Sequence, residues 1–402
     1  MDEGTSGIGQ RLREIRAWRD LSLRAAAGLA GFSASYLSMI ENGDRVVDKR
    51  STLEALASAL RVAPSELTST PWEIDPADSS GHSRVVVMEA ALDEYELGQD
   101  PGGLVRDWPE IAADITRLVD LTHVSADYDA QGELAPKLLA ELHACFVREP
   151  KHRPEVLLGL LHCYSSACWV TKRLGGRGLT LLAARLAHQC ADELGAPVWR
   201  GYAAWLRGDA AGGLSRTLQY KRAVGMADEL SPALDTPDVL QVYGMLHLSA
   251  ALAAAAQSDR DTATTHLDEA AAVAVRMDTE VGTFARLWFG VVNVGVWRTS
   301  LATEFGDGPK VAEIARGVNI ETIPSPSRRA EFYADVGRSM LPKRATRDEG
   351  TSVLLRAEQL APQRIRNDVF VREAVVSQLR FAHRDAVGRE LRGLAYRMGI
   401  SA

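Results

Sequence analysis

The segment SLRAAAGLAGFSASYLSMIENG, residues 22–43, decides how the N-terminal part of this chain folds. Ser22 and Ser33 each precede a short run of helix-forming residues, the position at which a hydroxyl caps the first free backbone N–H groups of a helix. Gly31 separates the two runs and Gly43 follows the second, because glycine readily adopts the left-handed backbone that ends a helix. The small Ala27 allows the helices to cross closely. The segment therefore predicts two short helices joined by a sharp turn.

Helices are also predicted on both sides of this pair. Upstream, apolar residues recur three or four positions apart from Ile8 to Ile15, which indicates one buried helix face. Downstream, the same spacing runs from Leu53 to Leu60, and Pro64 suits the first turn of a fifth helix. Residues 1–68 are therefore predicted to form a five-helix domain. Residues 69–82 are rich in Pro, Ser and Asp and lack periodicity, so we expect a linker.

Residues 83–402 are predicted to be entirely helical, with a repeating pattern. Alanine pairs four positions apart recur at steps of about 36 to 47 residues, counting a weaker copy at residues 311–315; the clear pairs are Ala187/Ala191, Ala223/Ala227, Ala270/Ala274 and Ala357/Ala361. Small residues let neighbouring helix pairs approach closely, so that stacking buries faces that one pair cannot bury alone. The fold class predicted is thus all-α, with a five-helix domain followed by an α-solenoid of helix pairs.

Charge is distributed unevenly along the chain. The net charge of the 402 residues is −7, yet residues 8–50 contain eight basic and five acidic residues and carry a net charge of +3. An acidic whole argues against non-specific nucleic-acid binding by the entire surface. A locally basic N-terminal domain fits a protein that contacts nucleic acid only there.

Several functional classes are disfavoured by the sequence. There is no signal pattern at the N-terminus and no apolar run as long as a membrane span, so a cytoplasmic protein without membrane contact is expected. The cysteines (Cys145, Cys163, Cys168, Cys190) form no C-x-x-C pair and are interpreted as reduced, buried thiols. The histidines His143, His152, His162 and His188 lack a metal-binding spacing, and the glycines of LGGRG at residues 174–178 lie in a turn between helices. We expect no enzyme activity, no metal and no cofactor.

The segment 22–43 resembles the helix-turn-helix of phage-repressor-like regulators of the xenobiotic-response-element family. The matching features are Ala27 and Gly31, the Phe-Ser pair that enters the third helix, Leu37 and Ile40 on its buried face, and the Glu-Asn-Gly ending. The likeness covers about 62 residues, through TLEALASALRV and the Pro-Ser-Glu-Leu that follows. It implies a transcriptional regulator whose partner is double-stranded DNA.

The resemblance also implies roles for individual residues. Arg16 and Glu41 occupy positions that form an internal ion pair in this family, joining the first helix to the third. The N-terminal part of the third helix should enter the major groove. Its exposed positions are expected to be Ala34, Ser35, Ser38 and Met39, and the residues placed to reach phosphates are Ser33, Asn42, Arg45, Lys49 and Arg50.

Two positions depart from the family pattern. Leu23 stands where the family usually has a glutamine that hydrogen-bonds the DNA backbone. Ala34 is too small to read a base edge except by contact with a thymine methyl group. Weak direct readout is therefore expected, with specificity arising partly from dimer spacing or DNA shape.

The remainder of the chain resembles tetratricopeptide repeats, most clearly at residues 246–274. The whole chain is similar to a recurrent actinobacterial type of regulator in YELGQDP (residues 95–101), the Phe-Gly-x-x-Asn-Val segment around Asn293 and the tail LRGLAYRMGI. In this repeat type the first helix of each pair lines a groove, which implies an effector-binding surface. The candidate groove residues are His162, Ser165, Trp169, Lys172, Trp205 and Asn293, although such side chains are more often contacts between packed helices. The arginine-rich segment 364–397 is interpreted as a solvated cap on the last repeat, with DNA or partner contact as the alternative.

These expectations combine into one hypothesis and two rivals. The hypothesis is a homodimeric, sequence-specific regulator whose helical domain senses a peptide or small molecule or binds a partner. The first rival is a protein-interaction scaffold with a vestigial DNA-binding domain, which Leu23 and Ala34 favour. The second, a DNA-binding antitoxin, is disfavoured by the long helical domain.

Overall fold

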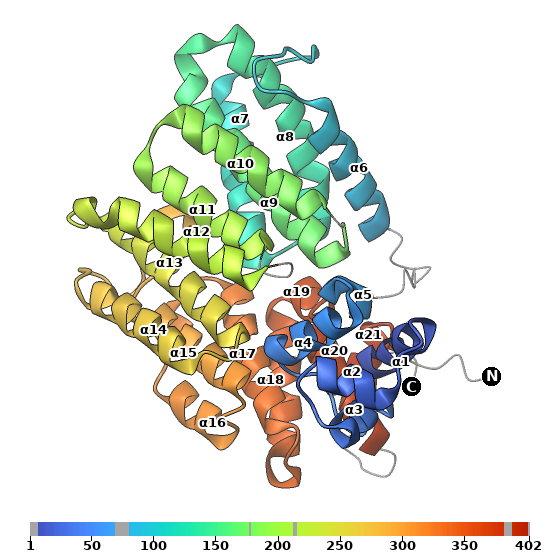
Figure 1. The fold of residues 1–402 in the computed structure, drawn as a ribbon. Coiled ribbons are helices and arrows are strands. Elements are labelled where there is room, and N and C mark those ends of the chain that lie inside the picture. Colours follow the sequence, from blue (N-terminus) through green and yellow to red (C-terminus); the bar gives the residue numbers. More distant parts are fainter. Residues whose placement is uncertain (1–6, 69–79, 177, 212–214, 382–387, 401–402) are drawn as a thin grey trace.

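The computed structural model describes residues 7–68, 80–176, 178–211, 215–381 and 388–400, and this part of the chain contains helices and no strand. Figure 1 shows a small N-terminal domain, the head, seated against the C-terminal end of a larger stack of helices, the body. The all-α class predicted from the sequence is confirmed.

The head consists of five helices around one apolar core. They are α1 (Ile8–Trp18), α2 (Leu23–Leu29), α3 (Ala34–Glu41), α4 (Arg50–Leu60) and α5 (Pro64–Leu67). The side chains of Leu12, Leu37 and Leu56 are almost completely buried in this core. A Cβ atom added at Gly9 would lie 2.0 Å from the carbonyl oxygen of Ile40, so glycine permits the close approach of α1 to α3. The five-helix head follows the pattern predicted from the sequence.

The predicted linker at residues 69–82 requires a correction at its C-terminal end. Residues 69–79 lie outside the described part of the chain. Residues 80–82 are helical, because α6 (Ser80–Glu94) begins at Ser80. Sequence patterns place the ends of helices only to within a few residues, and the start at Ser80 instead of Ser83 is a shift of that size.

The body starts with three long helices and continues as a series of helical hairpins. The first three are α6, α7 (Trp108–Asp120) and α8 (Tyr128–Arg148), with a short helical turn η1 (Leu121–Ser125) between α7 and α8. The hairpins are α9 (Arg153–Leu174) with α10 (Leu179–Leu194), α11 (Pro197–Ala211) with α12 (Arg216–Leu230), α13 (Pro237–Ala256) with α14 (Arg260–Val275), α15 (Val291–Phe305) with α16 (Pro309–Arg316), and α17 (Pro326–Met340) with α18 (Arg347–Leu360). The chain ends with α19 (Pro362–Arg366), α20 (Val369–Phe381) and α21 (Gly388–Arg397).

The alanines noted in the sequence lie at the contacts between these helices. Ala187, Ala223, Ala270 and Ala357 are all buried on the second helix of a hairpin. The first helices of successive hairpins also contact one another, from α9 through α11, α13 and α15 to α17. This is the arrangement of a helical-repeat stack, in which the first helices form one continuous face. We call that face the inner face.

Helix α13 lies at the centre of the body. Among the described residues it is the one helix long and apolar enough to cross a membrane, and 94% of its most apolar window is buried inside the protein. At Gly244 an added Cβ atom would lie 1.9 Å from the Phe289 ring, so the glycine makes room for an aromatic side chain from the segment just before α15. Such burial is typical of a core helix in a protein of this size.

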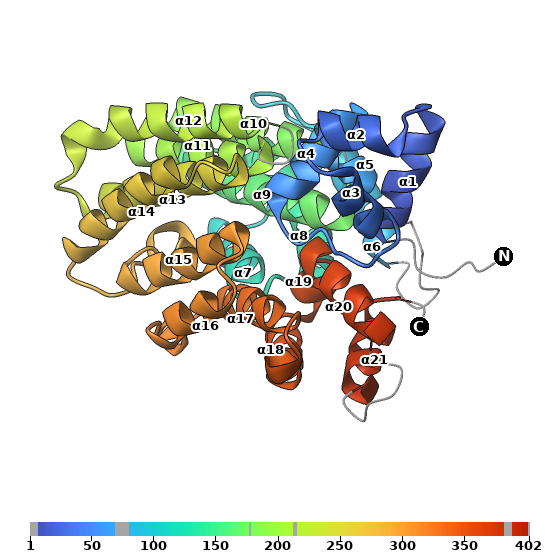
Figure 2. The same ribbon diagram turned by 60° about the horizontal axis from the view of Figure 1, so that its bottom comes forward.

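The stack of helices closes on itself. Helix α17 packs against η1, and the Ser325 hydroxyl at the start of α17 donates to the carbonyl oxygen of His123, at 2.7 Å. The Gln363 side-chain oxygen accepts the backbone N–H of Tyr128 at the start of α8, at 2.6 Å. The last helices of the body therefore return to its first helices, and Figure 2 shows α19 close to α8.

Candidate nucleic-acid interface and inner face of the body

Helices α2 and α3 carry their own N-terminal caps. The Ser22 hydroxyl accepts the backbone N–H of Ala25, and the Ser33 hydroxyl accepts that of Tyr36, each at 3.1 Å. Gly31 between them has a φ of +74°, in the region that favours glycine. This local chemistry produces the two-helix unit that the sequence predicted.

The N-terminal half of α3 presents small polar side chains to solvent. Ser33 and Ser35 are exposed, and Ala34, Ser38 and Met39 are half-buried. The Ser33 hydroxyl uses an acceptor orbital for its cap bond, and its O–H remains available to donate to a phosphate oxygen. Of the predicted groove-facing residues, Ser35 is thus exposed, whereas Ala34 packs partly against the head core.

An aromatic side chain that sequence reasoning missed organises the other side of α3. Tyr36 is half-buried against Phe32, with ring centroids 5.0 Å apart, and the Arg45 guanidinium lies over its ring at 5.0 Å from the centroid. This contact holds the exposed Arg45 beside α3 while its charge faces solvent. The sequence signal for this contact was the presence of an aromatic residue in α3, Tyr36, and a basic residue, Arg45, in the loop that follows.

Asn42 ends α3 and joins it to α1. Its side-chain oxygen accepts a hydrogen bond from the Arg13 guanidinium, and its amide group donates to the Ser38 hydroxyl at 3.5 Å. Asn42 is exposed, so a phosphate can approach it, but its amide is already engaged within the head.

Arg16 and Glu41 lie in direct contact, as the family resemblance implied. The Arg16 Nε and Nη2 atoms donate to the two Glu41 carboxylate oxygens at 2.6 and 2.8 Å, and Nη1 donates to the carbonyl oxygen of Leu21 at 2.8 Å. The hydrogen bond to Glu41 raises the pKa of Arg16 above its ordinary value. This bidentate pair joins α1, the turn before α2 and the end of α3, and so fixes the orientation of α3.

Lys49 and Arg50, which the sequence predicted to reach phosphates, both bind acceptors of the body in this structure. The Lys49 ammonium donates to the carbonyl oxygen of Phe305, at 3.2 Å, and Arg50 Nη1 donates to the Glu304 carboxylate, at 3.3 Å. Both cations therefore face the end of α15 in the body rather than solvent. In this conformation neither is free to bind a phosphate, because acceptors from a distant part of the chain take their hydrogen bonds.

The body also caps two of the three head helices that lack a side-chain cap of their own, α1 and α4. No side chain of the N-cap residue caps α1 or α4. At α1 the backbone N–H of Ile8 donates to the Glu373 carboxylate of α20, and at α4 that of Ser51 donates to the Glu304 carboxylate of α15, each at 3.0 Å. Carboxylates are favourable at these positions because the N-terminus of a helix carries partial positive charge. The head is thus held at two helix ends.

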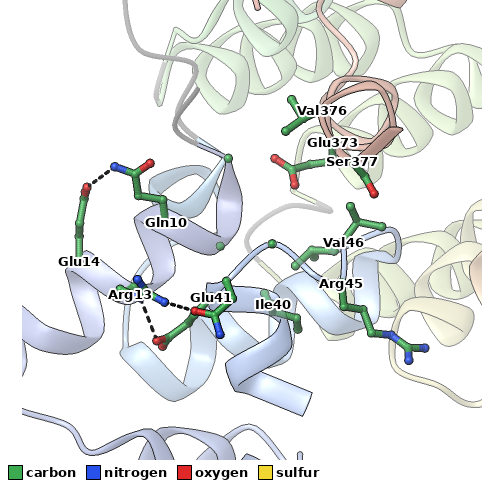
Figure 3. Close-up of a pocket in the computed structure, with 15 residues that line it drawn as sticks. Gln10, Arg13, Glu14, Ile40, Glu41, Arg45, Val46, Glu373, Val376 and Ser377 are labelled. Carbon is green, nitrogen blue, oxygen red and sulfur yellow. Dashed lines mark hydrogen bonds and ion pairs between the residues drawn. The ribbon is translucent and has the colours of Figure 1, made fainter. Parts of the chain in front are cut away.

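A cavity of about 430 Å³ lies at this seam between α1, the end of α3 and α20. Figure 3 shows Gln10, Arg13 and Glu41 on the head side and Glu373, Val376 and Ser377 on the α20 side. Nearby, Phe370 packs against the head core. The cavity lies away from the inner face, where the sequence placed the candidate groove.

The inner face brings five of the six predicted groove residues into one neighbourhood. The His162 ring packs edge-on against Trp199, the Ser165 hydroxyl lies 2.8 Å from the Tyr202 hydroxyl, and the Trp169 and Trp205 ring centroids lie 6.4 Å apart. The remaining residue, Lys172, binds Asp209 at 2.6 Å and lies over Trp169. Ser165 is fully buried and so serves the packing of α9 against α11, which is the alternative that the sequence left open.

Asn293, the sixth residue, lies in a different cluster on the inner face. Its side-chain oxygen accepts two hydrogen bonds from Arg328, at 2.9 and 2.8 Å, and Arg328 also binds Glu331 at 2.8 Å. Arg364 binds the same Glu331 carboxylate and is only 8% exposed. The predicted solvated face of segment 364–397 is therefore wrong at Arg364, because this side chain turns inward to reach a carboxylate on α17.

Burial sets the protonation of His123 in η1 and of His162 in α9. Desolvation lowers the pKa of His123 to about 3 and that of His162 to about 4. Both imidazoles are therefore neutral near pH 7. The buried Nδ1 atom of His162 and Nε1 atom of Trp169 have no hydrogen-bond partner in the described part of the chain.

The cysteine thiols are free and buried, and burial raises the pKa of Cys190 to about 12. Within the described ranges no three His, Cys, Asp or Glu side chains lie close enough together to hold a metal ion.

Comparison with known proteins places the head in a family. A family model described as a helix-turn-helix domain matches residues 8–69. An uncharacterized HTH-type transcriptional regulator, RghRB, from Bacillus subtilis (strain 168) is 33% identical over 94 residues, which cover 22% of this chain and 68% of the relative. The HTH-type transcriptional repressor RghR of the same organism is 43% identical over 55 residues, which cover 14% of this chain and 41% of RghR. No solved structure matches. The head and these matches show that the chain belongs to the helix-turn-helix type transcriptional regulators.

Proposed function

We propose that the protein is a cytoplasmic, sequence-specific transcriptional regulator of the xenobiotic-response-element type that binds DNA as a homodimer. The observation that carries the proposal is the outward N-terminal half of α3, with Ser33 and Ser35 exposed, on a head that matches a helix-turn-helix domain along its length. Each head would place α3 in the major groove at one half-site. Two-fold symmetry then requires half-sites one helical turn apart, about 34–36 Å, or a multiple of it.

The test is capture of genomic DNA fragments by the purified full-length protein. A regulator enriches discrete, palindromic sites, and its affinity falls steeply with salt because phosphate contacts release counterions. Replacement of the exposed Arg45 by alanine should reduce the slope of log K against log salt by about 0.9, the value for one phosphate contact. An unchanged slope would remove Arg45 from the interface, and no preference for any duplex would remove the regulator proposal.

We further propose that the body is a tetratricopeptide-type repeat domain that senses a peptide or small molecule on its inner face. Two features support an effector there: the aromatic side chains of Trp169, Tyr202 and Trp205 lie together, and buried ring nitrogen atoms of His162 and Trp169 lack hydrogen-bond partners among the described residues. Native mass spectrometry of the purified protein would detect a retained effector, and Trp169→Ala should release it. No cofactor is proposed.

A scaffold that binds a partner protein is the second candidate function. Leu23 favours it, because this half-buried side chain packs against the head core and cannot replace the glutamine that contacts the DNA backbone in the family. Ala34 also favours the scaffold, because its side chain is too small to read a base edge except by contact with a thymine methyl group. DNA capture without enriched sites, together with a stable protein complex, would support the scaffold.

A further inference from the structure

The start of α4 presents donors of the kind that suit an oxyanion. Three donors lie there: the backbone N–H of Ser51 and the Arg50 guanidinium bind one carboxylate, and the adjacent Lys49 ammonium donates to the carbonyl oxygen of Phe305. A helix N-terminus flanked by two cations is suited to phosphate, because N–H dipoles and positive charge act on the same ligand. We call these three groups the α4 anion site.

The site is occupied by a carboxylate of the body. Glu304 at the end of α15 accepts from Ser51 through one oxygen, at 3.0 Å, and from Arg50 through the other, at 3.3 Å. Its side chain is only 2% exposed. A carboxylate buried to this degree requires donors that satisfy it, and the head supplies them. Glu304 therefore occupies the position that an oxyanion from outside the protein would take.

DNA is the source of such an oxyanion. The loop from Asn42 to Lys49 leads directly from the C-terminal end of α3 to α4, so the α4 anion site flanks the helix proposed to enter the major groove. Helix N-termini and basic side chains that flank a recognition helix bind backbone phosphates in protein–DNA complexes. The exposed face of α3 stays open in this conformation, whereas the adjacent phosphate contacts are taken.

We propose that Glu304 competes with a DNA backbone phosphate for the α4 anion site, so that the body lowers the affinity of the head for DNA. This inference rests on the proposed function of the head. Two further contacts hold the head against the body: Arg216 of α12 binds Glu54 of α4 at 2.6 Å, and Arg338 of α17 donates to the carbonyl oxygen of Asp48 at 3.4 Å. The head binds DNA fully only after α4 separates from α15.

The experiment compares three variants of the full-length protein for binding to a labelled duplex of mixed sequence. Glu304→Gln removes the competing charge. Glu304→Asp keeps the charge but shortens the side chain, so the carboxylate no longer reaches Ser51. Glu313→Gln, at an exposed position on α16, removes the same charge elsewhere and is the matched control. Circular dichroism checks that each variant is folded.

Both Glu304 variants should bind DNA on the order of tenfold more tightly than the wild type at low salt, the equivalent of one charge-assisted hydrogen bond. Their slope of log K against log salt should steepen by about 2, since separation of α4 from α15 frees Arg50 from Glu304 and Lys49 from the Phe305 carbonyl, at about 0.9 each. Lys49→Gln should lower the slope of log K against log salt by about 1 when it is added to Glu304→Gln. The same substitution should scarcely change the slope when it is made in the wild type. The Glu313 control should match the wild type.

Equal affinity and slope for the Glu304 variants and the control would overturn the competition. Absence of salt-dependent binding in every protein, the wild type included, would instead overturn the proposed function of the head. The two failures are therefore distinguishable.

Discussion

Arg16→Ala should destabilise the head more than any other single loss of charge on α1. The substitution removes two hydrogen bonds to Glu41, at 2.6 and 2.8 Å, and leaves a carboxylate whose side chain is only 3% exposed. Breaking a buried ion pair by removing one partner costs about 3–5 kcal/mol. Because the Arg16 side chain is 18% exposed and Arg13 Nε remains 3.6 Å from Glu41, we expect about 2–4 kcal/mol.

Hydrogen exchange of the full-length protein measures this loss where it occurs. Peptides from α1 and α3 should lose protection by about 30-fold to 1000-fold in Arg16→Ala, with each tenfold corresponding to about 1.4 kcal/mol. Arg13→Ala is the matched control, because this side chain contacts the same carboxylate but is 51% exposed, and it should cost below about 1 kcal/mol. Equal losses in the two variants would refute the reasoning from burial.

Three further predictions concern packing and protonation. Gly244→Ala places a methyl group 1.9 Å from the Phe289 ring, so denaturant unfolding of the body should show a loss of roughly 3 kcal/mol; an unchanged midpoint would contradict the packing. Gly9→Ala, at 2.0 Å from a carbonyl oxygen of α3, should reduce exchange protection in the head but not in the body. Burial lowers the pKa of His123 to about 3 and of His162 to about 4. Below about pH 6.5 the unfolded chain therefore binds protons that the folded chain does not, and each histidine should lower stability by up to about 1.4 kcal/mol per unit fall in pH. Unfolding at several pH values checks this, with His162→Gln expected to flatten the slope.

Sequence reasoning predicted those features of the head that depend on neighbouring residues. Ser22, Ser33 and Gly31 specify caps and a turn within a few positions of themselves, so α2 and α3 could be placed without knowledge of the fold. The helical body followed equally from the alanine spacing, because one small residue per turn is what close packing between hairpins requires.

The same reasoning failed where the partner of a side chain is distant in the sequence. The contact of Arg50 with Glu304 could not be foreseen, because the two residues lie 254 positions apart and no local pattern connects them. Arg364 was expected in solvent because its partner, the Glu331 carboxylate, belongs to a different helix pair and could not be found from the neighbouring sequence. Helical spacing places His162, Ser165, Trp169 and Lys172 on one face of α9, while the separate position of Asn293 beside Arg328 could not be foreseen.

The contact between the last helices of the body and its first helices changes how the repeats share stability. In an open array each repeat depends only on its two neighbours, and removal of a terminal repeat leaves the opposite end intact. Here Ser325 and Gln363 bind backbone groups at His123 and Tyr128, so the C-terminal helices supply part of the stability of the N-terminal ones. Truncation before α17 should therefore loosen α7 and α8 as well, and the body should unfold as one cooperative unit instead of fraying from its ends.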